Sequence, residues 1–331
     1  MFQISFRAMG CQMKAMVDSE SVHAAAALRE VPRWFAAWER CLSRFREDSE
    51  LSLLNHSDGR WMRVSPTMWE VLRAALLAAQ LSEGLVVPTV LPALEAAGYD
   101  RPFEELLRGT PEAADEDEVE TREVGSWSWA AIQLDLKRRM VKLPEGVRLD
   151  LGGIAKGWAA DQAVRRLKPY GPALVDAGGD IAVSGPMANG EPWPIGVADP
   201  RSAPRSVLED PPLLGILRVA RGGVATSGRD VRRWRRGAEE QHHLIDPRTG
   251  RPARTDVLAV TVVAPTAYEA EIAAKVVFLR GSREGVAWLE ERPGFAGLIV
   301  RHDGEILWSS RWSMEPAGAV PTSGQGGPDG A

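Results

Sequence analysis

The sequence predicts an α+β fold in which mixed, largely antiparallel sheets are flanked by helices. Three observations predict this class. Residues 2–17 are rich in apolar and β-prone side chains, residues 22–42 and 66–82 have helical spacing, and short strands and helices alternate from residue 126 onward. At 331 residues, the chain is long enough to bury a sizeable core.

The two predicted helices carry boundary signals of different clarity. Pro32 can end or kink the helix at 22–42, because proline lacks the backbone N–H that a helix interior needs. The helix at 66–82 is the clearer one. Ser65 suits its N-cap, Pro66 takes its first position, and the apolar residues that follow keep a period of 3.6.

Composition along the chain indicates one folded unit with two solvated segments. We expect a single domain over 1–314. Residues 108–124 are acidic and nearly free of large apolar groups, which predicts a solvated excursion. Residues 315–331 are rich in glycine and proline, which predicts a disordered tail.

Bulk properties exclude several classes of function. The formal net charge of −5 gives no global basic field for nucleic acid, and no apolar stretch is long enough to span a membrane. The two cysteines, Cys11 and Cys41, are too few for a disulfide framework. No export signal is recognisable, and no apolar run precedes Cys11. We therefore expect a cytoplasmic protein.

The stretch from Asp150 to Gly157 (DLGGIAKG) points to a ligand. A short strand is expected to run into two glycines, after which a helix starts with Lys156 in its first turn. Glycines allow a ligand to approach the backbone, and a helix start offers free N–H groups. A cation there opposes the helix dipole, and a bound anion would relieve that conflict. A tight turn with a solvent-facing lysine is the alternative. A second glycine pair at 178–179 can wall the same pocket.

The stretch from Asp150 to Asp161 resembles the signature of the FAD:protein FMN transferase family, the ApbE-type "thiamine biosynthesis lipoproteins". Further family motifs follow in family order over roughly residues 5–290. They are AMG at 8–10, LSRF at 42–45, SELSLLN at 49–55, AGGD at 177–180, ATSG at 225–228 and HLIDPRTG at 243–250. The resemblance implies an ApbE-like, T-fold-related architecture.

The resemblance also implies a reaction and its residues. The FMN half of FAD would pass to a Ser or Thr hydroxyl of a target protein that carries an FMN-binding domain, and AMP would leave. His243, before the D-P-x-T-G turn, would be the base, with His242 beside it in an unassigned role. The implied FAD contacts are Met9, Asn55, Asp150, Lys156, Ser227 and Ile245.

Two other functions stay open at this point. The chain can be an FAD pyrophosphatase that releases FMN and AMP, or a non-catalytic FAD-binding relative. Ser227 and Gly228 are expected to form a turn that borders the cleft, and a Ser in such a turn is not by itself a nucleophile. The arginine-rich run at 229–236 is expected to be a solvated face, with docking of an acidic partner or of phosphates as the alternative.

The expected magnesium site departs from the family pattern. A capping box at Thr266 to Glu269 starts a helix that ends near Gly281 and follows a strand at 257–264. In the family this helix carries an aspartate and, four residues later, a threonine, both magnesium ligands.

Glu271 and Lys275 occupy those positions here, and because they lie four residues apart on one helix face, we expect them to pair with each other. A lysine ammonium has no acceptor and cannot ligate a cation. Either the ammonium of Lys275 sits where the metal would, or the metal moves to the carbonyl of Gly153 and the carboxylate of Glu271. Charge repulsion between a lysine and a divalent ion favours the first interpretation.

A second departure lies at 84–90, where Val87 stands at a family aspartate. The tryptophan-glycine that follows in the family is replaced by Ala97-Gly98-Tyr99. We therefore assign no FAD contact to these positions.

Overall fold

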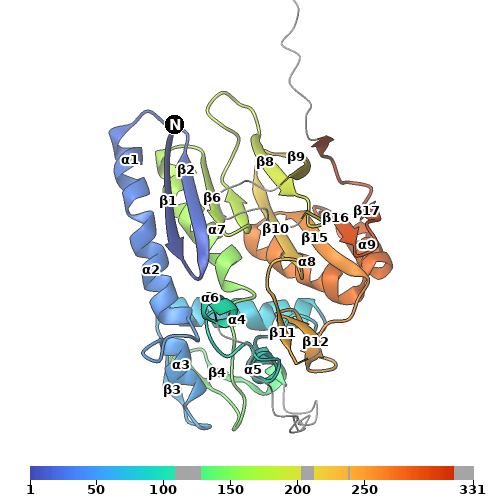
Figure 1. Ribbon diagram of the computed structural model, residues 1–331. Coiled ribbons are helices and arrows are strands. Elements are labelled where there is room, and N and C mark those ends of the chain that lie inside the picture. The colour runs from blue at the N-terminus through green and yellow to red at the C-terminus, as the bar shows by residue number, and fades with distance from the viewer. Residues whose placement is uncertain (109–127, 203–211, 238, 317–331) are drawn as a thin grey trace, which may run out of the picture.

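An eight-stranded sheet forms the centre of the computed structural model, which describes residues 1–108, 128–202, 212–237 and 239–316 (Figure 1). The strand order is β1-β2-β6-β7-β10-β15-β16-β17, and every neighbouring pair is antiparallel. The strands are β1 (Phe2–Ala8), β2 (Cys11–Val17), β6 (Ala173–Ala177), β7 (Ile181–Val183), β10 (Gly222–Gly228), β15 (Val257–Ala264), β16 (Ala296–Arg301) and β17 (Ile306–Trp308). The predicted α+β class with largely antiparallel sheets is confirmed.

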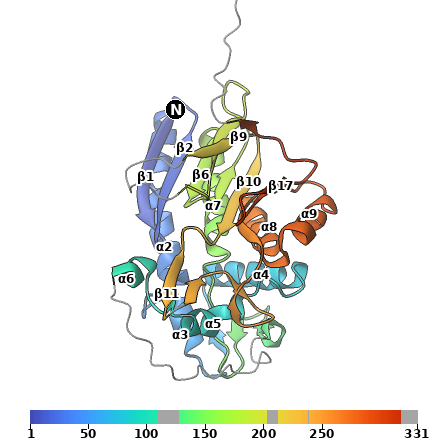
Figure 2. The same cartoon turned by 45° about the vertical axis from the view of Figure 1, so that its right-hand side comes forward.

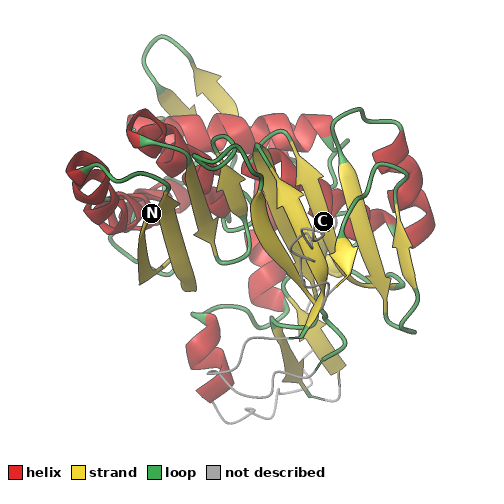
Figure 3. Cartoon of the chain, turned by 90° about the horizontal axis from the view of Figure 1, so that it is seen from above, coloured by secondary structure: helices red, strands yellow, loops and turns green. Residues whose placement is uncertain are grey.

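Helices cover one face of this sheet (Figure 3). They are α1 (Val22–Arg29), α2 (Val31–Leu42), α7 (Ala155–Leu167), α8 (Ala267–Arg280) and α9 (Ser282–Glu290). Alternating side chains of a strand point to opposite faces, so Val175 of β6 packs in the cluster under the helices, whereas Leu174 packs in a separate cluster with Trp193. The sheet is therefore buried on both sides.

A three-stranded sheet supplies the second cover. It consists of β8 (Trp193–Ala198), β9 (Leu213–Val219) and β18 (Glu315–Pro316) in the order β18-β9-β8. Glu315 and Pro316 were predicted to be disordered, but they pair with β9, and Arg218 holds Glu315 at 3.0 Å. The rest of the predicted tail and nearly all of the acidic segment lie outside the described residues.

Shorter elements gather below the main sheet (Figure 2). The helices are α3 (Glu50–Asn55), α4 (Pro66–Leu81), α5 (Leu91–Ala96) and α6 (Phe103–Arg108), with 3-10 turns η1 (Pro88–Val90) and η3 (Trp129–Ala131). A further 3-10 turn, η4 (Lys168–Tyr170), lies elsewhere, at the C-terminal end of α7 beside α1. The strands are β3 (Met62–Arg63), β4 (Gln133–Asp135), β5 (Met140–Lys142), β11 (Arg233–Arg236), β12 (Glu239–His242), β13 (Ile245–Asp246) and β14 (Arg251–Pro252).

Local sequence signals account for most element boundaries. The predicted helix at 22–42 is broken at Glu30, and Pro32 lies in the first turn of its second half, where the missing N–H costs no hydrogen bond. The Ser65 hydroxyl accepts the N–H of Met68 at 3.2 Å and starts α4 at Pro66 as predicted. Among the described residues, no helix has both the length and the apolarity to cross a membrane.

The prediction of a strand running into the paired glycines is wrong. Strand β5 ends at Lys142, and residues 147–151 form no strand. A side chain takes the place of a neighbouring strand at Leu149. The amide of Asn55 donates to the Leu149 carbonyl (2.9 Å) and accepts from the Leu149 N–H (2.7 Å).

Candidate active site

A cavity of about 1090 Å³ lies where the β1–β2 turn, the start of α7 and strand β10 meet. It brings together segments that are far apart in the sequence. Its lining includes Met9, Asp150, Gly153, Lys156, Ser227, His243, Ile245, Glu271 and Lys275, which are residues singled out from the sequence. Asn55 is not in this lining, because both ends of its amide are taken up by Leu149.

The tight turn between β1 and β2 forms one wall. Met9 and Gly10 connect the paired residues Ala8 and Cys11, and both connecting residues have a positive φ, 49° and 68°. This is the geometry of a two-residue turn that matches the twist of the hairpin. Left-handed backbone is costly for methionine, so the turn presents Met9 to the cavity in a strained conformation.

The glycine turn before α7 is fixed by a buried ion pair. The Asp150 carboxylate accepts the Gly152 N–H at 2.8 Å and meets the Arg44 guanidinium at 2.7 Å. Helix α7 then begins at Ala155, and its N-cap residue Ile154 provides no side-chain cap. In the first turn, the Ala155 N–H donates to the Leu151 carbonyl and the Gly157 N–H to the Glu271 carboxylate, and this helix start faces the cavity.

Lys156 does not point to solvent, which excludes the alternative interpretation of this turn. Its side chain is 15% exposed, and its ammonium contacts Asp180 and lies 3.8 Å from Glu271. Burial opposes the charged form, but the two carboxylates outweigh burial and raise the pKa of Lys156. The lysine in the first turn of α7 is therefore a fixed cation.

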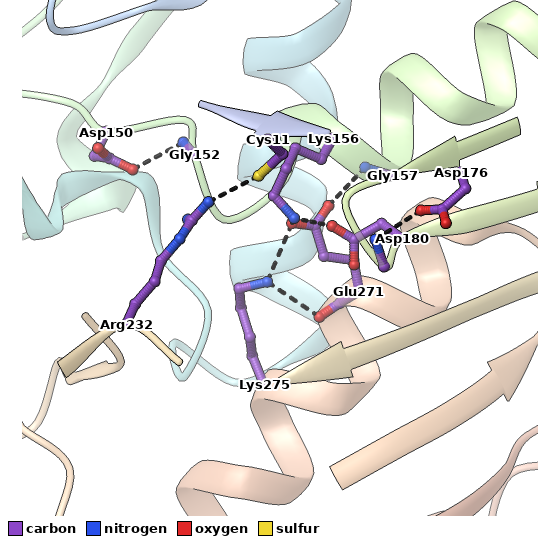
Figure 4. A network of polar contacts seen from close by, with 11 residues as sticks. Cys11, Asp150, Gly152, Lys156, Gly157, Asp176, Asp180, Arg232, Glu271 and Lys275 are labelled. Atoms are coloured by element: carbon purple, nitrogen blue, oxygen red, sulfur yellow. Dashed lines mark hydrogen bonds and ion pairs between the residues drawn. The ribbon is translucent and has the colours of Figure 1, made fainter. Parts of the chain in front are cut away.

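Four alternating charges make up the polar end of the cavity (Figure 4). We call Lys156, Asp180, Glu271 and Lys275 the charge cluster. Lys275 Nζ lies 3.2 Å from Glu271 Oε1, so the predicted i,i+4 pair on α8 is confirmed. Burial and the neighbouring Glu271 raise the pKa of Asp180. Burial works against the charge of Glu271, yet Lys275, Lys156 and the Gly157 N–H lower its pKa.

The residues at the family magnesium position do not fit a divalent cation. Glu271 Oε2 accepts the Gly157 N–H at 2.9 Å, and its Oε1 faces Lys275, so both oxygens are engaged. A Cβ on Gly153 would lie 3.1 Å from Lys275 Cε, which puts the lysine directly against this glycine. In the described part of the chain, no group of three or more His, Cys, Asp and Glu side chains is placed to hold a metal. A site made of Gly153 and Glu271 therefore disagrees with the donor set present.

His243 faces the cavity just before β13. Its Nδ1 lies 3.4 Å from the carbonyl oxygen of Arg232. Burial, followed by the charges of Arg232 and Lys275, lowers the pKa of His243 well below its usual value, so the imidazole is neutral near pH 7. A carbonyl only accepts hydrogen bonds, so Nδ1 must donate, which leaves the lone pair of Nε2 free as a base.

His242 has a different role. It is buried, its Nε2 lies 3.0 Å from the Ala253 carbonyl, and its Nδ1 accepts the Leu244 N–H at 3.3 Å. Its ring packs edge-on against Phe278. His242 therefore holds the segment that presents His243 to the cavity.

Three charged residues of the site received no role from the sequence. Asp180 lay in the AGGD motif and Arg44 in the LSRF motif, which drew attention to both segments but not to these side chains. Arg232 lay in the run expected to be solvated, yet it reaches into the cavity and donates to Cys11 Sγ at 3.0 Å. Its neighbours Arg233 and Arg235 are exposed, as expected.

The opposite end of the cavity is aromatic and apolar. The Arg44 guanidinium lies over Phe45 and Tyr99, 4.0 and 4.7 Å from the ring centres, and Tyr99 packs against Trp234 at 5.3 Å. Val87 and Tyr99 both line this end, and both belong to the second departure from the family pattern described above. Flat stacking surfaces and a buried guanidinium suit an aromatic ring system.

Ser227 is not in a turn as predicted. It lies inside β10, paired with Val260 of β15, and is buried against the cavity. Its backbone is thus fixed by sheet hydrogen bonds. The adjacent Thr226 and Thr261 hydroxyls are 2.9 Å apart across the same two strands.

Comparisons with known proteins agree with this arrangement. The chain matches the family model described as "ApbE family" over residues 9–299. The FAD:protein FMN transferase of Treponema pallidum (strain Nichols) is 30% identical over 316 residues, covering 91% of this chain and 84% of that protein. The FAD:protein FMN transferase of Salmonella typhimurium (strain LT2) is 27% identical, covering 88% and 81%.

Solved structures with the same fold carry ApbE titles. The ApbE protein of Thermotoga maritima superposes with a TM-score of 0.80 at 28% identity, covering 93% of this chain and 97% of that one. The flavin transferase ApbE from Vibrio cholerae superposes with a TM-score of 0.74, covering 93% and 97%; at 24% identity, this second likeness concerns the fold.

Proposed function

This chain belongs to the ApbE family, and from that premise we propose that it transfers the FMN half of FAD to a Ser or Thr hydroxyl of a target protein and releases AMP. One observation carries the proposal. A neutral histidine, the start of helix α7 and three partly buried cations (Lys156, Arg232 and Lys275) line the same cavity. Such a site offers what phosphoryl transfer needs: charge neutralisation, positioning and a base.

The reaction is a substitution at phosphorus. The target oxygen forms a bond to the FMN-side phosphorus, and the bond from that phosphorus to the bridging oxygen breaks. The electron pair of the broken bond stays on the oxygen that leaves with AMP. The hydroxyl proton goes to Nε2 of His243, which is free because Nδ1 is directed at the Arg232 carbonyl. No step uses a divalent cation, because the donor set does not fit one.

The cavity walls supply binding at both ends of FAD. The cations and the backbone at 152–156 oppose the two phosphate charges. The aromatic end, lined by Arg44, Phe45 and Tyr99, supplies stacking surfaces for a flat ring, and such surfaces can accept either ring system of FAD. We assign the implied FAD contacts Met9, Asp150, Lys156, Ser227 and Ile245 to this cavity.

Asn55 belongs to the same proposal in an indirect way. It holds the backbone of Leu149, and the next residue, Asp150, borders the cavity. Its contribution to FAD binding would pass through the position of the turn.

The test is an incubation of the purified protein with FAD and a candidate FMN-binding-domain protein, followed by intact mass of the partner. We expect the partner to gain the mass of an FMN ester, and its variant with the acceptor hydroxyl replaced by alanine to stay unchanged. Release of free FMN and AMP without a modified partner would identify a pyrophosphatase instead. Bound but intact FAD would identify a binding protein.

A further inference from the structure

We propose that the ammonium of Lys275 takes the place of a divalent cation, so that this chain binds FAD without Mg²⁺. The proposal deepens the proposed function and rests on it for the identity of the ligand. It concerns the donor set at Glu271 and Lys275, which does not fit a divalent ion because both Glu271 oxygens are engaged.

The first argument is steric. Lys275 Nζ lies 3.2 Å from Glu271 Oε1 and 3.4 Å from the Glu271 carbonyl oxygen. On its other side, an atom built as Cβ of Gly153 would be 3.9 Å from Nζ. The ammonium therefore fills the space between Glu271 and the glycine turn. Figure 4 shows the Lys275 side chain directed at Glu271. A metal between the same two residues would have to displace it.

The second argument concerns the remaining ligand. Glu271 is 1% exposed and is pinned from three directions, by the Gly157 N–H at 2.9 Å and by the ammonium groups of Lys156 and Lys275. Turning its carboxylate toward a metal would leave the Gly157 N–H buried without an acceptor. Such a loss is unfavourable in a low-dielectric site.

The third argument is the charge balance. The two lysines and two carboxylates of the charge cluster sum to zero. With an uncharged residue at position 275 the same cluster would carry one negative charge and repel a pyrophosphate. A divalent cation would then be needed to reverse the sign. Lys275 supplies a fixed positive charge at this place, and a second cation beside it would be repelled.

The experiment compares FAD binding in EDTA and in saturating MgCl₂ by quenching of flavin fluorescence. For the unaltered protein, we expect the two dissociation constants to agree within about twofold. For Lys275→Thr, we expect FAD binding in EDTA to weaken by about 10- to 100-fold, the loss of a charge-assisted contact, and MgCl₂ to restore part of it. Lys137→Thr, a change at an exposed turn outside the cavity, is the matched control and should behave like the unaltered protein.

A second measurement needs no FAD. Mn²⁺ alone is titrated and followed by its electron paramagnetic resonance signal. We expect no saturable site in the unaltered protein and one site in Lys275→Thr. If that variant does not fold, Lys275→Gln keeps most of the side-chain volume and serves the same purpose.

These two measurements separate the possible failures. Saturable Mn²⁺ binding by the unaltered protein, or FAD binding that requires MgCl₂, overturns the role of Lys275. Failure of the unaltered protein to bind FAD in either buffer overturns the proposed function, and the Mn²⁺ titration still decides whether Lys275 excludes a metal.

Discussion

The starts of helices α7 and α8 meet the same physical demand in opposite ways. The N–H groups of the first turn of any helix need acceptors. At α8, the Thr266 hydroxyl accepts the Glu269 N–H at 3.1 Å, and the Asp161 carboxylate accepts the N–H groups of Ala267 and Tyr268 at 3.0 and 2.9 Å. At α7, the N-cap residue Ile154 offers no side-chain acceptor, the Gly157 N–H donates to the Glu271 carboxylate at 2.9 Å, and a partly buried lysine occupies the first turn.

Packing shows the same contrast. A Cβ on Gly223 would overlap the backbone of Ala267, so the start of α8 has no room even for a methyl group. A Cβ on Gly153, beside the start of α7, would meet only the flexible end of Lys275 at 3.1 Å. The start of α8 is therefore a closed side, capped and packed by the protein. The start of α7 is an open side only toward the cavity, because Gly157 in its first turn packs against Ala267.

The largest expected effect is on the open side, at the start of α7. His243→Ala removes the base that faces the start of α7, and we expect FMN transfer to fall by about 10²- to 10⁴-fold. FAD affinity and thermal stability should stay close to those of the unaltered protein, because within the described part of the chain the His243 ring makes one long hydrogen bond. Single-turnover transfer and FAD titration measure the two effects. Transfer at the original rate would remove His243 as the base.

On the closed side, the largest effect should be on folding. Gly223→Ala forces β10 and the start of α8 apart, and we expect a loss of about 3 kcal/mol in the free energy of unfolding. Gly153→Ala is the matched control, expected to cost less than about 0.5 kcal/mol because only the Lys275 side chain has to shift. Urea titration measures both variants. Equal losses would contradict the distinction between the two helix starts.

Loss of the Thr266 cap is a milder change on the closed side, at the start of α8. Thr266→Ala deletes the hydroxyl that caps α8 but leaves the Asp161 bonds, and we expect a loss of about 1 kcal/mol in stability. FAD affinity should not change, since Thr266 does not line the cavity. A variant with normal stability and weakened FAD binding would show that the start of α8 also serves the ligand.

The smallest expected effect is that of pH on the transfer rate. The pKa of His243 lies well below its usual value, so its deprotonated, active form persists on acidification. Between about pH 7.5 and pH 6 we expect the transfer rate to change by less than about twofold, whereas a base with the ordinary pKa of about 6.5 would lose roughly fourfold. A rate profile at saturating FAD tests this, and a fall centred near the ordinary value would contradict the burial of the imidazole.

Sequence reasoning succeeded where a signal is local. The Ser65 cap, the capping box at Thr266 and the pairing of Glu271 with Lys275 each depend on residues three or four positions apart, and all three are present. The position of Lys156 in the first turn of α7 was also predicted.

The contacts and conformations that the sequence did not predict depend on the arrangement of distant segments. Asp180 reaches Lys156 only because β6 and β7 place the second glycine pair beside the start of α7, and no spacing in the sequence encodes that contact. Arg232 looked like one arginine of a solvated run, although the chain turns it inward before β11 begins. Ser227 resembled a turn residue because neighbouring glycine is typical of turns, but pairing with β15 extends the strand through it.

The pair of hydrogen bonds between Asn55 and Leu149 joins positions 94 residues apart in the sequence. The glycine turn has no sheet partners along 147–151, so α3 is one of its anchors, beside the Arg44–Asp150 ion pair and the bond from the Asp150 N–H to the Pro88 carbonyl. Local opening of α3 would therefore loosen the turn, and a ligand seated on the turn would in return slow that opening. A ligand in the cavity would thus slow the hydrogen exchange of α3, a helix that does not line the cavity.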